Sequence, residues 1–185
     1  MIISLSGKAG AGRTTVAEVI CEKLWYEHIS VWNIKKRKAQ EMGITILEFN
    51  KIGDLPENVE AYDLSYEKYQ QELDTNSKIL LDSKLCAYNQ PHSFRIRFLV
   101  SDEIAANRLI HDTKRFGDIV WDYDKVLENI KQRNEEERQR YLRLYQFDLY
   151  DPNNYDIVIN TDHFSAQEVA EILLFAFERW AKNQK

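Results

Sequence analysis

The chain has 185 residues, of which 44% are hydrophobic and 30% charged, and its formal net charge is −5. These values predict one globular domain with a sizeable core, and the acidic balance argues against a broad nucleic-acid surface. No apolar run is long enough to span a membrane, the two cysteines form no disulfide or metal pattern, and the opening residues do not resemble a signal peptide, so we expect a cytoplasmic protein with no membrane partner.

The first 24 residues carry the strongest functional signal. The apolar run at residues 1–5 predicts a buried parallel strand, and an amphipathic helix is expected to begin at Arg13. The residues between follow the phosphate-binding loop spacing G-x-x-x-x-G-K-[ST], with arginine in place of lysine. Glycines let such a loop turn its backbone N–H groups onto phosphate oxygens. The residues expected to bind phosphate are Gly7, Lys8, Ala9, Gly10, Ala11, Gly12, Arg13, Thr14 and Thr15.

The start of this first helix predicts a bound nucleotide and a metal ion. The helix N-terminus adds partial positive charge, and the Thr14 hydroxyl can ligate magnesium. Arg13 keeps the charge of the usual lysine but is bulkier and not interchangeable with it. Three interpretations therefore stay open: a phosphoryl-transfer enzyme, a nucleotide-binding protein with slow or no turnover, and an ordinary strand-to-helix turn.

The later elements are expected to alternate between strands and helices. Strands are predicted at 26–31, 78–82, 93–100 and 155–161, and helices at 33–42, 56–74, 101–115 and 123–145. Capping-box patterns at Thr45 and Ser165 predict a short helix and a terminal helix, and 116–122 reads as a loop. This alternation predicts an α/β fold: a parallel sheet of five strands with helices on both faces.

In such a sheet, ligands bind beyond the carboxyl ends of the strands. Asp82 ends an apolar strand there and can hold magnesium through water beside Thr14, although a strand-end aspartate can also simply cap a turn. Lys84 projects from the same rim and can meet a substrate phosphate. The basic run 35–38 cannot point all its charges at one site, but one of them, with Asn33, can line a pocket for the acceptor phosphate.

Arginines are concentrated late in the chain. Arg108 and Arg115 share one predicted helix, and the loop at 116–122 can close as a lid that brings arginines in and expels water. On the next helix, pairing with the glutamates at 135–137 is the alternative to a functional role. That alternative is favoured for Arg140.

Taken together, these residues resemble the cytidylate kinases of the archaeal and cytidylate-kinase-like type, in the nucleoside monophosphate kinase group. The blocks that carry the resemblance are IISLSGKAGAGRTTVAEVICEKL, HISVWNI followed by MGITILEFNKI, ILLDSKLCAY and RQRYLRLYQFDLYDPNNYDIVINTDHFSAQEVAEIL. The resemblance implies a single P-loop NTPase-type domain of three layers over 1–185, with a monophosphate-binding insertion at 33–76 and a lid at 108–140. It implies transfer of the γ-phosphoryl group of ATP to CMP or dCMP with Mg²⁺, by a monomer.

The resemblance also implies a role for each matching residue. The catalytic residues would be Arg13, Asp82 and Arg138, with Thr14 and Asp82 at the metal. Arg108 and Arg115 would join the loop in binding ATP. The acceptor would be bound by Asn33, Lys36, Gln70, Lys84 and Arg133.

The chain departs from the family's pattern mainly on the acceptor side. Trp32-Asn33 replaces a small residue and an acid, Ser83-Lys84 replaces Gly-Arg, and Tyr69 stands where another arginine is common. A lysine is a point charge where arginine grips phosphate with two N–H groups. A kinase for another small acceptor therefore remains an alternative, as does a nucleotide-binding protein with weak or lost catalysis.

Overall fold

A computed structural model describes residues 1–53, 55, 57–112 and 122–184. Its centre is a parallel sheet in the order β2-β3-β1-β4-β5. The first strand lies in the middle, so the loop that follows it opens at the centre of the carboxyl edge. The strands are β1 (Ile2–Gly7), β2 (Glu27–Ser30), β3 (Ile79–Asp82), β4 (Phe94–Leu99) and β5 (Ile157–Asn160).

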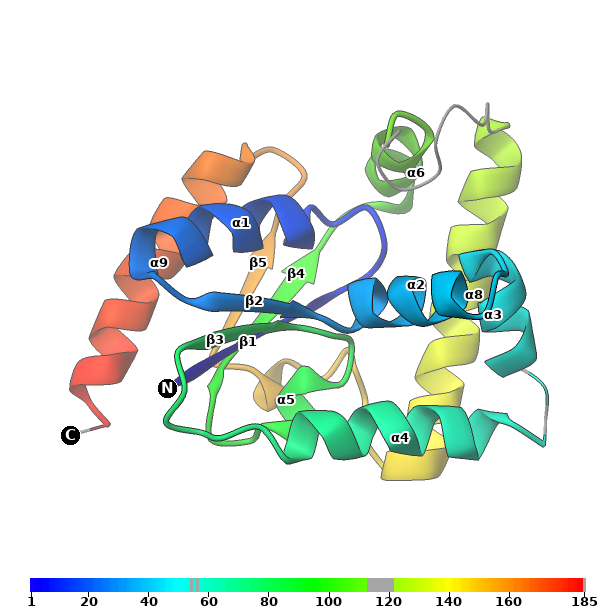
Figure 1. Cartoon of the computed structure of the whole chain (residues 1–185). Helices are drawn as coiled ribbons and strands as arrows, with labels where there is room; N and C mark the ends of the chain where they lie inside the picture. The colour runs from blue at the N-terminus through cyan, green and yellow to red at the C-terminus, as the bar shows by residue number, and fades with distance from the viewer. Residues whose placement is uncertain (54, 56, 113–121, 185) are drawn as a thin grey trace.

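Helices cover both faces of the sheet, and α1 and α9 lie on the opposite face from α4 and α5 (Figure 1). The segment between β2 and β3 contributes α2, α3 and α4, and α8 stands beyond the carboxyl ends of the strands. The described helices are α1 (Arg13–Leu24), α2 (Val31–Glu41), α3 (Ile46–Gly53), α4 (Val59–Gln71), α5 (Cys86–Asn89), α6 (Asp102–Ile110), α8 (Tyr123–Tyr145), α9 (Ala166–Lys182) and the 3₁₀ turn η1 (Pro152–Asn154).

The core forms because the strands are apolar on both faces. On β4, Ile96 and Phe98 are buried among residues of α1, α6 and α9. On the other face, Ile2 of β1 and Leu81 of β3 pack with Cys86 of α5. This burial is typical of a parallel sheet covered by helices on both sides.

Short polar signals fix where several helices begin, as predicted. The Ser165 hydroxyl accepts from the N–H of Glu168, whose carboxylate accepts from the N–H of Ser165, and this capping box begins α9. Thr45 and Glu48 make the same exchange before α3. Each box satisfies backbone donors that the first turn of a helix leaves free.

Some predicted boundaries differ from the structure. β2 and β5 are shorter than their apolar runs, α4 ends at Gln71, and α6 ends at Ile110, where the sequence suggested 115. The short helix α5 was not predicted, because four residues are too few to show a period. Arg115 and most of the predicted lid loop lie outside the described residues. None of the described helices combines the length and apolar character needed to cross a membrane.

Candidate phosphate-binding site

The loop after β1 has the backbone form that its glycines predict. Gly10 and Gly12 have φ of 80° and 81°, in the left-handed region, and Gly12 caps the start of α1. A Cβ at Gly10 would lie 2.6 Å from the carbonyl oxygen of Ala105, so only glycine allows α6 to approach this closely. The loop is therefore a tight turn held against α6 and followed at once by a helix N-terminus.

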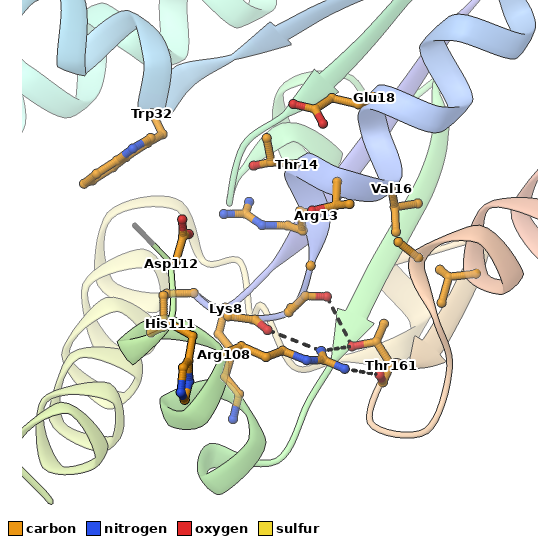
Figure 2. Close-up of a pocket in the computed structure, with 18 of the residues that line it drawn as sticks. Lys8, Arg13, Thr14, Val16, Glu18, Trp32, Arg108, His111, Asp112 and Thr161 are labelled. Carbon is orange, nitrogen blue, oxygen red and sulfur yellow. Dashed lines mark hydrogen bonds between the residues drawn. The ribbon is translucent and has the colours of Figure 1, made fainter. Parts of the chain in front are cut away.

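Polar side chains attach the loop to the rest of the molecule. Lys8 pairs with Asp102 in the first turn of α6. Arg108 donates to the carbonyl oxygens of Gly10, at 3.4 Å, and Thr161, at 2.7 Å. The Thr161 hydroxyl donates to the carbonyl of Ala11 at 3.1 Å. These contacts join the loop to α6 and to the end of β5, and Figure 2 shows those that Arg108 and Thr161 make.

A cavity of about 670 Å³ opens over this loop. Every residue from Lys8 to Thr15 lines it, and so does Arg108. Asn33 and Lys36 of α2, both predicted on the acceptor side, line the same space, and so does Trp32. Figure 2 shows Trp32 and Asp112 on the side toward which the Arg13 guanidinium points. The phosphate loop and part of the predicted acceptor segment therefore share one cavity.

Arg13 and Asp82 form an ion pair at the carboxyl edge of the sheet. Nη1 of Arg13 lies 2.8 Å from Oδ1 of Asp82, whose side chain is 4% exposed. Nε2 of His28, on β2, lies 3.9 Å from the other carboxylate oxygen. The arginine at the lysine position of the loop thus reaches the aspartate at the end of β3.

Lys84 and Arg133 meet at a buried carboxylate. Lys84 pairs with Glu137 of α8, and Nε of Arg133 lies 3.1 Å from Oε1 of the same glutamate. Burial alone would raise the pKa of Glu137, but the two cations lower it to about 2. Burial lowers the pKa of Lys84 to about 8, although Glu137 opposes this shift. Lys84 and Arg133, the two predicted substrate-binding residues, are therefore held together by their shared ion pairs with Glu137 of α8.

Arg138 is held by Asp148 rather than by the glutamates near it in sequence. Its Nε and Nη2 donate to the two carboxylate oxygens at 3.1 and 2.7 Å. The pKa of Asp148 is lowered, first by this hydrogen bonding. The guanidinium also lies over the ring of Tyr150, 5.3 Å from its centre. The segment after α8 thus fixes the direction of Arg138.

Gln70 is fully buried at the end of α4. Its Nε2 donates at 3.0 Å to the carbonyl of Tyr66 and to the carboxylate of Glu67, which fixes the orientation of the amide. Within the described part of the chain, its Oε1 has no hydrogen-bond partner. This amide oxygen is therefore a buried acceptor that no donor of the described residues uses.

Comparison with known proteins agrees with this geometry. The sequence pattern of the cytidylate kinase-like family matches residues 2–163. The chain belongs to this family. The cytidylate kinase of Methanobrevibacter smithii is 31% identical over 94% of this chain and 96% of its own length. The S-adenosylmethionine-dependent nucleotide dehydratase of Lacinutrix mariniflava is 33% identical over 96% of this chain, which spans 36% of that longer protein.

Solved structures place this cytidylate kinase-like chain among the P-loop kinases by fold. The shikimate kinase of Bacteroides thetaiotaomicron superposes with a TM-score of 0.68 over 96% of this chain and 98% of its own, at 15% identity. The shikimate kinase of Acinetobacter baumannii superposes with a TM-score of 0.60 over 94% of this chain and 90% of its own, at 19% identity. The predicted fold class is therefore confirmed.

The predicted site residues of this family member fall into two groups. The loop, Arg108, Asn33 and Lys36 gather around the cavity. Asp82, Lys84, Arg133 and Arg138 gather instead in ion pairs along β3 and α8, and Gln70 is buried in α4.

Sequence reasoning missed several residues that shape the site. Thr161, Glu137 and Asp148 orient the predicted residues. In the sequence, each is a single polar residue, and its partner in the structure lies in another segment of the chain, so no local pattern indicates the contact. Arg97, buried on β4, lies in the strand predicted at 93–100, and no role in the site was predicted for it. Its signal was a charged residue inside an apolar run, which is unusual in a buried strand.

Proposed function

We propose that the protein transfers the γ-phosphoryl group of ATP to a pyrimidine nucleoside monophosphate, CMP or dCMP. The observation that carries the proposal is the single cavity shared by the phosphate loop and by Asn33 and Lys36 of α2. Phosphoryl transfer requires donor and acceptor in line and positive charge around the moving group, more than covalent chemistry by the protein. One cavity lined by both segments supports that arrangement.

Gln70 supports a cytosine base over uracil. Its Nε2 is committed to Tyr66 and Glu67, which leaves Oε1 as an acceptor. Cytosine presents an amino donor at position 4, where uracil presents a carbonyl acceptor. An amide oxygen facing that position would bind the first and repel the second.

Each remaining side chain receives a role from its chemistry. The loop N–H groups and the N-terminus of α1 bind the phosphates of ATP, and Arg108 keeps the loop in shape. Arg13, directed by Asp82, and Arg138, directed by Asp148, supply charge to the transferring group. Lys36, Asn33, Lys84 and Arg133 face the acceptor phosphate. ATP binding by Arg115 is proposed from the sequence alone.

The donor atoms fit Mg²⁺ entering with ATP. Thr14 lines the cavity, and Asp82 presents a buried carboxylate at the end of β3, where it pairs with Arg13. Oxygen donors of this kind suit magnesium, which keeps several waters and binds through few protein ligands. We propose that Thr14 binds the ion directly and Asp82 through water. Bound there, the ion neutralises phosphate charge.

A coupled ATPase assay with CMP, dCMP, UMP and AMP, and with shikimate and gluconate as other small acceptors, tests the proposal. We expect turnover with CMP and dCMP, within the range of about 1–100 per second typical of kinases, and at least tenfold lower kcat/KM with UMP. Turnover with a non-nucleotide alone would reject the nucleotide acceptor and favour a kinase for another small molecule.

The Arg13–Asp82 pair gives one reason to keep a second candidate, a nucleotide-binding protein with weak catalysis. An arginine committed to a buried carboxylate is less free to follow a moving phosphoryl group than a lysine. If Arg13→Lys raised kcat by orders of magnitude at unchanged ATP affinity, this second candidate would replace the first.

A further inference from the structure

Arg97 is a buried arginine that no step of the proposed reaction uses. It lies on β4 beside Ser6, the residue before the phosphate loop, and only 3% of its surface is exposed. Its neighbours Ile96 and Phe98 point into the core beneath α1, so Arg97 points to the opposite face of the sheet. There its Nη1 donates to the Ser6 hydroxyl at 3.4 Å.

Arg97 forms no ion pair within the part of the chain that the structure describes; Asp148 interacts with it only at longer range. No described carboxylate lies within ion-pair distance of it, and its Nε has no hydrogen-bond partner among those residues. The rings of Tyr150 and Tyr155 flank the guanidinium at 5.1 and 5.9 Å. By contrast, Arg95 on the same strand binds Asp156 through two nitrogens.

A buried, unpaired charge lowers stability unless something compensates for it. Aromatic faces compensate only in part, since a cation–π contact is weaker than a charged hydrogen bond. An apolar side chain at this position would stabilise the folded chain at least as well. A ligand that brings negative charge would compensate the charge of Arg97.

The surroundings of Arg97 have the charge to receive a phosphate. The guanidinium groups of Arg97 and Arg138 both lie near the ring of Tyr150, which is 41% exposed, so this is where the cluster meets the surface. Across the cluster, four cations face two carboxylates, which leaves a charge of +2 among these described side chains. The members are Lys84, Arg97, Arg133 and Arg138, against Glu137 and Asp148.

We infer that Arg97 binds the phosphate of the acceptor, a phosphomonoester that enters beside Tyr150. The inference rests on the proposed function and adds to it a residue from β4. Nε and an Nη of one guanidinium can grip two phosphate oxygens, and the dianion matches the surplus of positive charge. The ring of Tyr150 lies next to the guanidinium of Arg97, at the exposed side of this position.

The test compares Arg97→Met and Arg97→Lys with the matched control Arg95→Met, on the same strand. For each protein we would measure the affinity for CMP, inorganic phosphate and ATP by calorimetry, and the free energy of unfolding without ligand. Arg97→Met is expected to weaken CMP and phosphate binding at least tenfold, to leave ATP affinity within twofold, and not to lower stability. Arg97→Lys should recover part of the affinity, and Arg95→Met should leave it unchanged.

Two results would overturn the inference. If Arg97→Met destabilised the protein while CMP and phosphate affinity stayed the same, Arg97 would be a structural residue that orders Tyr150. If the parent protein bound neither CMP nor phosphate, there would be no anion site for Arg97 to serve. Failure of the proposed function is distinguishable: a parent that binds phosphate through Arg97 but phosphorylates no nucleotide would reject the function and keep the site.

Discussion

Two glycines of the phosphate loop share one conformation but not one environment. Gly10 and Gly12 both have φ near +80°. An added Cβ would lie 2.6–2.9 Å from backbone and side-chain atoms of Ala105 at Gly10, whereas at Gly12 it would meet nothing within 4 Å. Substitution at Gly12 therefore costs only backbone strain, and substitution at Gly10 must also push α6 away.

We predict that Gly10→Ala and Gly12→Ala differ sharply. Gly12→Ala should lower the free energy of unfolding by about 1 kcal/mol, the cost of a left-handed residue with a side chain. Gly10→Ala should lower it by about 3 kcal/mol or more, because overpacking is added to the same strain. Urea unfolding measures both, and equal effects would show that the contact with α6 does not constrain the loop.

At the scale of elements, the sequence predicted those whose signal is local. The boundaries of α8 and the starts of α1 and α9 match because a cap or a long period marks them within a few residues. The phosphate loop is equally local, so all of its predicted residues gather as expected. The ends of β2 and β5 depend on how far neighbouring strands pair, which no local pattern records.

The acceptor side was harder to predict for the same reason. Lys84 and Glu137 are 53 residues apart, and nothing near Lys84 shows that a carboxylate of α8 will meet it. Arg138 has glutamates close in sequence but binds Asp148, because the chain turns back after α8. The family resemblance identified Lys84 and Arg138 as site residues, whereas the fold shows with which carboxylates they form ion pairs.

The Lys84–Glu137–Arg133 cluster connects α8 to the end of β3, and its contribution to the free energy of unfolding depends on pH. Burial alone would raise the pKa of Glu137, but the cations hold it at about 2, while an unfolded glutamate titrates near about 4.3. Between these two pKa values, Glu137 therefore binds more protons in the unfolded chain than in the folded one. The stability from ionised Glu137 is present above the unfolded pKa and is lost as the pH falls through the folded pKa.

Glu137→Gln should therefore lower the free energy of unfolding by about 3 kcal/mol at neutral pH, because it leaves two cations near a neutral amide. The difference from the parent should shrink as the pH falls from about 4 toward 2. Glu136→Gln is the matched control, since Glu136 is exposed on the same helix and accepts a hydrogen bond from Gln132. A constant difference at every pH would contradict the ionised state of Glu137.

At the scale of the whole molecule, positive charge is concentrated where phosphates are expected. The chain carries a formal charge of −5. Even so, Arg13, Lys84, Arg97 and Arg138 lie together at the carboxyl end of the sheet, beside a loop and a helix N-terminus that also attract anions. We expect this local concentration of cations to attract small anions such as phosphates.

This distribution predicts how the unliganded protein responds to nucleotide. ATP at about 100 times its dissociation constant should raise the free energy of unfolding by about 2.7 kcal/mol, which corresponds to a rise in Tm of roughly 5–10 °C for a chain of this size. Adenosine is the matched ligand without phosphates. In the proposed binding mode the loop N–H groups contact only the phosphates, so adenosine at the same concentration should shift Tm by less than a quarter as much. Equal Tm shifts with ATP and adenosine would show that most of the binding free energy comes from the nucleoside and not from the phosphates at the loop.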